Sequence, residues 1–149
     1  MSEEIDQLKS LHTALIDARN GYEEALHEAD GQGLTTLFRE MMVLHGENAD
    51  VVAMHLRLLN EQVDDNGSFL STIHRTVMSV RSLFGGLDES ILPGLVDGEE
   101  RMLGYYDEAI EHSPPGSAIH NSLVEMRQAL IGKISYFKTL KVSVDAAPR

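Results

Sequence analysis

The sequence predicts an all-α protein: a four-helix bundle of two antiparallel hairpins joined by a helical crossover. Apolar residues recur three and four positions apart through most of the 149 residues, which is the period of a half-buried helix. Clusters of Gly and Pro divide the chain into helical pieces. Two of the breaks are short, so the helices on either side must run antiparallel. No segment alternates apolar and polar residues between turn signals, and we expect one domain over residues 1–149.

The first predicted helix covers about residues 3–29 and the second about 34–63. The apolar stripe of the first is Ile5, Leu8, Leu11, Leu15, Ala18, Tyr22, Leu26 and Ala29. The predicted inner face of the second is Leu37, Met41, Leu44, Val51, Val52, Leu58 and Leu59, with His45, Asn48 and His55 on or beside it. The turn at 30–33 is short, which predicts an antiparallel hairpin.

A shorter third helix is predicted to begin at Ser68, a good N-cap residue, and to stop before Gly85. At ~1.5 Å per residue it would span roughly 25 Å, enough to carry the chain back along a bundle. The two glycines that follow it and the Ser-Pro-Pro-Gly break at 113–116 separate the later helices. The predicted elements of this half are helices over about 68–84, 88–112 and 117–142, then a frayed tail over 143–149.

Charge and composition narrow the class of protein. The chain has 24 acidic and 12 basic side chains, so its formal net charge is −12. Nucleic acid and anionic membranes require clustered Lys and Arg, so we expect neither as a partner. No apolar run approaches the ~18 residues of a membrane span, and the acidic first residues lack the apolar core of a signal peptide. We therefore expect a cytoplasmic protein. With no cysteine, thiolate catalysis and Cys-ligated metals are excluded.

Glu99 is the most informative residue because it falls on the inward stripe of a helix that is otherwise apolar. That stripe is Leu92, Leu95, Met102, Tyr106 and Ile110. A carboxylate in a helical core is costly unless it is paired, hydrogen-bonded or bound to a metal. Inward glutamates are also how four-helix carboxylate proteins hold two iron ions. Glu99 therefore marks a candidate interior site.

An internal echo supports a two-fold plan for the chain. Residues 22–26 (Tyr-Glu-Glu-Ala-Leu) resemble residues 106–110 (Tyr-Asp-Glu-Ala-Ile), and each string precedes a predicted hairpin turn. A chance match of two short amphipathic strings is the alternative. By this echo the counterpart of Glu99 in the first helix is Leu15, which cannot bind a metal.

The order of hairpin, long crossover and second hairpin is that of ferritin-like bundles. The chain resembles a bacterial family of ferritin-like four-helix bundles known as a domain of unknown function. The resemblance runs over residues 5–142 and is most specific from Gly67 to Ala109. It rests on Asn20-Gly21-Tyr22, Gly67-Ser68, His74-Arg75, Gly98-Glu99, Tyr106 and Ala109. It implies the fold and no particular reaction. The chain departs from the family where Thr76 and Val77 replace an aromatic residue that often follows the His-Arg pair.

A complete di-iron site needs a Glu from each of two helices and a Glu-x-x-His pair from each of the other two. No Glu lies three residues before His45, and Gln128 stands where the last helix would need a His. Glu125 is predicted to face outward, and the Glu24–His27 pair also points away from the core. We predict a degenerate site, replaced by an interior polar cluster. Its predicted members are Tyr22, His45, Asn48, Glu99, Tyr106 and Lys133.

Several functions are compatible with this pattern. We expect a non-catalytic bundle with no catalytic residues and no cofactor, acting as a homo-oligomer or on a protein partner, and connected with stress. The alternative is a metal-binding (Fe, Mn or Zn) or ferroxidase-like protein that uses Glu99 and His45 as ligands. A third possibility is a small-ligand binder that uses the same polar cluster. His74 and Arg75 are predicted to brace the crossover against the bundle.

Overall fold

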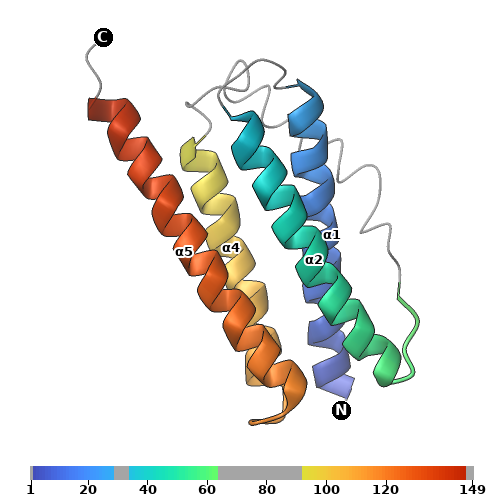
Figure 1. The fold of residues 1–149 in the computed structure, drawn as a ribbon. Coiled ribbons are helices and arrows are strands. Elements are labelled where there is room, and N and C mark those ends of the chain that lie inside the picture. Colours follow the sequence, from blue (N-terminus) through green and yellow to red (C-terminus); the bar gives the residue numbers. More distant parts are fainter. Residues whose placement is uncertain (1, 29–33, 64–91, 147–149) are drawn as a thin grey trace.

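The computed structural model describes residues 2–28, 34–63 and 92–146 (Figure 1). This part of the chain is all-helical and contains no strand, as predicted. Its helices are α1 (Ser2–Glu28), α2 (Thr35–Leu58), α4 (Leu92–Glu111) and α5 (Ala118–Ala146). The predicted crossover helix at 68–84 and the predicted start of the next helix at 88 lie outside the described residues.

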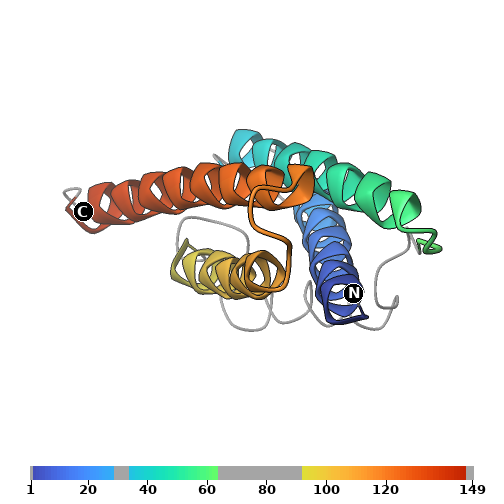
Figure 2. The same ribbon diagram turned by 90° about the horizontal axis from the view of Figure 1, so that it is seen from below.

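The four helices form two hairpins, α1 with α2 and α4 with α5, packed side by side (Figures 1 and 2). α1 also packs along α4, whereas α2 approaches α5 only locally. Seen from below, α5 leans away from α2 toward its C-terminal end (Figure 2). None of the described helices is long and apolar enough to span a membrane.

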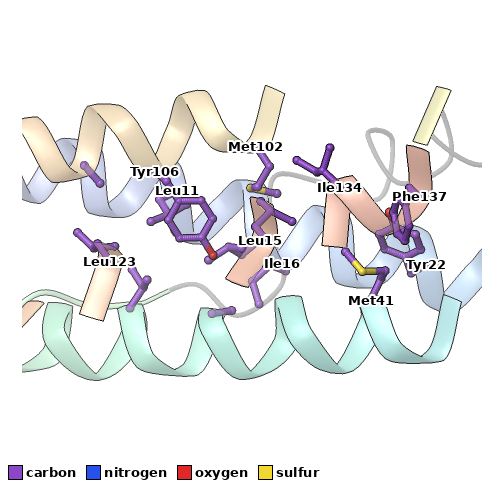
Figure 3. Close-up of a cluster of buried hydrophobic side chains, with 14 of the residues drawn as sticks. Leu11, Leu15, Ile16, Tyr22, Met41, Met102, Tyr106, Leu123, Ile134 and Phe137 are labelled. Atoms are coloured by element: carbon purple, nitrogen blue, oxygen red, sulfur yellow. The ribbon is translucent and has the colours of Figure 1, made fainter. Parts of the chain in front are cut away.

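The apolar stripes of the four helices meet in one core (Figure 3). Burial of this apolar surface is the main force that holds the bundle together. The largest fully buried side chains are Tyr106, Phe38, Phe137, Leu8, Leu11, Leu15, Ile16, Met41, Leu56, Leu92 and Leu123. Tyr106 is buried while its neighbour Tyr105 is exposed, because adjacent residues on a helix point about 100° apart.

α2 ends five residues before the predicted end at 63 because Asn60 adopts a left-handed conformation, with φ of 64°. The N–H of Asn60 donates to the carbonyl oxygen of Arg57, and the N–H of Glu61 donates to that of Leu56. These two bonds form a Schellman motif, in which Asn is tolerated at the left-handed position. The prediction that Leu58 lies on the inner face was wrong: its side chain is 72% exposed, and Leu56 is buried instead.

The Ser-Pro-Pro-Gly break at 113–116 separates α4 from α5 as predicted, but α5 is longer than the predicted last helix. The Ser113 hydroxyl donates to the carbonyl oxygen of Ile110, and the Ser117 hydroxyl accepts from the N–H of His120 near the start of α5. α5 then continues to Ala146, four residues past its predicted end at 142, and residues 147–149 of the predicted tail lie outside the described residues. The physical reason is that no helix-breaking Gly or Pro occurs after Gly132 until Pro148.

Candidate interior polar site

Glu99 is buried in the middle of α4, with only 3% of its surface exposed. The buried residues nearest to it on the same helix face are Val96, Met102 and Tyr106. The apolar stripe that folds α4 onto the bundle therefore carries this carboxylate into the core. A carboxylate at such a position is tolerated only if partners replace the water it has lost.

Tyr22 of α1 and His45 of α2 are those partners. The Tyr22 hydroxyl donates a hydrogen bond to Oε2 of Glu99. The Nε2 atom of His45 lies 2.9 Å from Oε1 and 3.0 Å from Oε2 of the same carboxylate. The His45 ring, which is fully buried, also stacks on the Tyr22 ring with centroids 5.9 Å apart. Three helices are thereby joined at one carboxylate.

The protonation pattern follows from this geometry. An ionised carboxylate can only accept hydrogen bonds, so the proton in this contact is on Nε2 of His45. The Nδ1 atom is buried and has no hydrogen-bond partner among the described residues. Burial, the charge of Glu99 and the hydrogen bond to Glu99 together raise the pKa of Tyr22 well above its ordinary value of 10.0. Tyr22 therefore remains a protonated donor across the physiological range.

A second, neutral hydrogen bond lies beside this network. The side-chain amide of Asn48 in α2 donates to the Tyr106 hydroxyl in α4 over 3.1 Å. Burial raises the pKa of Tyr106, the bond from Asn48 lowers it, and the nearby charge of Glu99 raises it again. We call Tyr22, His45, Asn48, Glu99 and Tyr106 the interior network. The structure thus brings five of the six predicted cluster residues together.

Lys133 is not part of the interior network, so that prediction was wrong. Its Nζ atom lies 3.6 Å from Oε2 of Glu40 on α2, and its side chain is 37% exposed. On α5 the inward positions belong to Leu130, Ile134 and Phe137. Lys133 falls to the side of that stripe, where a long side chain can cover apolar surface and still place its charge in water. The predicted brace residues His74 and Arg75 lie outside the described residues.

Sequence reasoning missed several polar features of the described chain, among them the buried Glu4, His12 and Ser113. His12 is buried next to Leu11 on α1, and its position four residues before the buried Ile16 was a signal that could have revealed it. The buried Ser113 hydroxyl lies 2.8 Å from Nδ1 of His120 and fastens the α4–α5 turn. Because that hydroxyl also donates to the backbone, it is a structural contact rather than an activated nucleophile.

A missed surface cluster lies at the C-terminal end of α4. Glu108, Glu111 and His112 place one carboxylate or imidazole atom each within 4.8 Å of the others. Nδ1 of His112 is 2.9 Å from the carbonyl oxygen of Glu108, and this bond raises the pKa of the imidazole most, with smaller contributions from Glu3, Glu111 and Glu108. Both carboxylates are exposed, as such groups commonly are on acidic proteins without a bound ion.

The interior donor set does not fit a di-iron centre within the described part of the chain. The interior network contains one carboxylate, and both of its oxygens already accept hydrogen bonds. Leu15, at the echo position in α1, is fully buried and apolar. A metal placed between Glu99 and His45 would have to break the contacts that now satisfy them. Two iron ions need four carboxylates and two imidazoles converging from four helices.

The fold and the site define the class: an all-α bundle of two hairpins with a hydrogen-bonded carboxylate in its core. Residues 3–112 match the family model described as "Domain of unknown function (DUF2383)". This match covers well over half of the chain, so the chain belongs to that family. No curated protein and no solved structure matches it.

Proposed function

We propose that this chain is a ferritin-like bundle that keeps the architecture without di-iron chemistry and acts by associating with protein, either a second copy or another chain. The observation that carries the proposal is that both carboxylate oxygens of Glu99 already have hydrogen-bond partners. Tyr22 and His45 use both oxygens that a metal would need. The pairing of α1 with α2 and α4 with α5, with α1 beside α4, supports the ferritin-like comparison.

In this proposal the interior network has a structural role. Tyr22, His45 and Glu99 come from three helices, so a shift of any helix by one turn would separate them. A buried carboxylate left without partners is costly, and that cost penalises alternative registers. The network therefore favours one register of the four helices. In this proposal the protein partner binds to the surface of the bundle. A role in stress responses is part of the same proposal and depends on the partner.

Metal analysis tests the loss of metal chemistry. The protein would be made in iron-supplemented medium, purified without chelator, and its metal content per chain measured by elemental mass spectrometry. The same measurement on Glu99→Ala tests the interior carboxylate. Glu100→Ala is the matched control, because Glu100 is the next residue of α4 but is exposed and paired with Lys138. We expect no stoichiometric metal in any of the three proteins.

The second candidate function is a metal-binding or ferroxidase-like protein. It is favoured by one observation: an imidazole nitrogen and a carboxylate converge to 2.9 Å inside the bundle. It requires near-integral Fe, Mn or Zn that disappears in Glu99→Ala and persists in Glu100→Ala. That pattern would overturn the non-catalytic proposal and make His45 the next residue to replace.

A further inference from the structure

The outward face of α5 differs from the rest of the described surface. Its exposed residues around the helix side opposite the core are Asn121, Val124, Glu125, Gln128, Ala129, Gly132, Ser135, Tyr136 and Thr139. Glu125 is the only charged residue among them. Lys138 lies nearer to α4, where its Nζ is 3.6 Å from Glu100. α5 forms one edge of the bundle, and its C-terminal end extends past the N-terminal end of α4 (Figures 1 and 2).

The exposed surfaces of the other three helices are strongly charged. Their exposed charged residues include Glu3, Asp6, Glu23 and Glu24 on α1, Arg39, Glu40, Glu47 and Asp50 on α2, and Asp97, Glu100, Asp107 and Glu108 on α4. With a formal net charge of −12, two copies of the chain repel each other over most approaches. The outward face of α5 is the approach at which this repulsion is weakest among the described helices.

Gly132 lies at the centre of this face, and the fold does not require a glycine there. A Cβ atom at Gly132 would meet nothing within 4 Å. A glycine inside a helix costs ~1 kcal/mol relative to alanine, so the isolated chain would be more stable with another residue. Close approach of a second helix does require a small residue, because the side chains at the contact set the distance between helix axes.

We propose that the outward face of α5 binds the same face of a second copy, with the two α5 helices antiparallel across a two-fold axis at Gly132. Such an axis brings together residues equally distant from Gly132 on either side. Gln128 then faces Tyr136 of the other copy, and Glu125 faces Thr139. No carboxylate on this face meets its own copy, so the surface is self-complementary. Tyr136, which is 50% exposed, supplies apolar area and a hydroxyl for the Gln128 amide.

This inference deepens the proposed function, because both require association with protein. The α4 helix offers a useful contrast, since Gly104 also has open space at its Cβ position. A two-fold axis at Gly104 would place Glu100 opposite Glu108 and Asp97 opposite Glu111 of the other copy, so a contact there would bring like charges together. Gly104 therefore provides a matched control for every substitution made at Gly132.

Sedimentation velocity over a range of concentrations tests the interface on the full chain. We expect a dimer for the unmodified protein and for Gly104→Glu. Gly132→Glu and Gly132→Lys each place like charges on both sides of the axis, so we expect the dimer dissociation constant to rise at least about tenfold in both. Because both variants replace a helix glycine, circular dichroism at concentrations where the unmodified protein is also monomeric should show an unchanged or higher melting temperature.

Disulfide trapping provides a second measurement that does not depend on weakening the contact. The chain has no cysteine, so Gly132→Cys introduces a single thiol near the proposed axis. We expect mild oxidation to cross-link this variant as a dimer and to leave Gly104→Cys as single chains. A monomer at all concentrations would overturn the inference and leave association with a different chain as the remaining form of the proposed function. A dimer that persists in both charged Gly132 variants, together with no cross-linking of the Gly132→Cys variant, would overturn this interface alone.

Discussion

Tyr22 and Tyr106 occupy equivalent places in the two echo strings, yet their hydroxyl groups have hydrogen-bond partners of different kinds. Tyr22 donates to the carboxylate of Glu99, while Tyr106 accepts from the amide of Asn48. Both side chains point inward, and both reach across to the other hairpin. The difference arises because the echo position of Glu99 in α1 is the apolar Leu15. The repeat therefore preserves the face that each helix buries, but at the echo position of Glu99 the first half carries the apolar Leu15 in place of a carboxylate.

The largest expected effect comes from replacing Glu99, the charged partner of Tyr22. Glu99→Leu leaves the Tyr22 hydroxyl and His45 Nε2 buried without their acceptor, so we expect a loss of ~1–3 kcal/mol in the free energy of unfolding. Urea denaturation measures it. The triple variant with Tyr22→Phe and His45→Leu removes the stranded groups as well, and we expect it to recover stability to the unmodified level or above. Unchanged stability of Glu99→Leu alone would show that the network does not hold the bundle.

The next effect is a loss of stability at alkaline pH. The folded-state pKa of Tyr22 is raised above 10.0, so above pH 10 the unfolded chain loses this proton while the folded chain keeps it. The free energy of unfolding should therefore fall as pH rises from 10 toward the folded-state pKa. Tyr106 acts in the same direction. We expect Tyr22→Phe to flatten this slope, measured by denaturation at several pH values. The exposed Tyr105→Phe variant is the control, and an equal slope in Tyr22→Phe would contradict the prediction.

Removing the neutral hydrogen bond between Asn48 and Tyr106 should lower the free energy of unfolding by a smaller amount. Tyr106→Phe removes one neutral hydrogen bond and leaves the Asn48 amide unpaired, for which we expect a cost of about 1 kcal/mol. Thermal unfolding of Tyr106→Phe beside Glu99→Leu provides the direct test. A cost at Tyr106 as large as that at Glu99 would mean that the two halves of the interior network act as one unit. A double-mutant cycle between the two positions would then measure their coupling.

The smallest effect is expected at Lys133. Its ion pair with Glu40 is partly exposed and spans 3.6 Å, and pairs of this kind contribute ~0–1 kcal/mol. Lys133→Met should therefore leave the unfolding free energy nearly unchanged, with little difference between low and high salt. A loss as large as that of Glu99→Leu would instead place Lys133 among the groups that hold the buried carboxylate.

The sequence predicted the helices and the interior position of Glu99 because both follow from periodicity. A stripe of apolar residues determines which side of a helix is buried, and a carboxylate on that stripe goes inside with it. Lys133 could not be placed in the same way, because a residue at the edge of a stripe can turn toward the core or toward water. The early end of α2 depends on a left-handed Asn60, which competes with an apolar pattern that continues to Val63. Tyr22 and His45 could be named as partners because Tyr22 falls on the apolar stripe of its helix and His45 on or beside that of the next.

The separation along the chain of the groups that meet at Glu99 has a consequence for folding kinetics. Tyr22 and Glu99 are 77 residues apart, and His45 and Glu99 are 54 apart. Each hairpin can form from contacts that are much closer in sequence, and local contacts form faster than distant ones. The carboxylate is therefore satisfied only when the two hairpins dock. A chain whose hairpins dock in the wrong register would carry a buried, unpartnered carboxylate. We therefore expect Glu99 to affect the docking step rather than the formation of either hairpin.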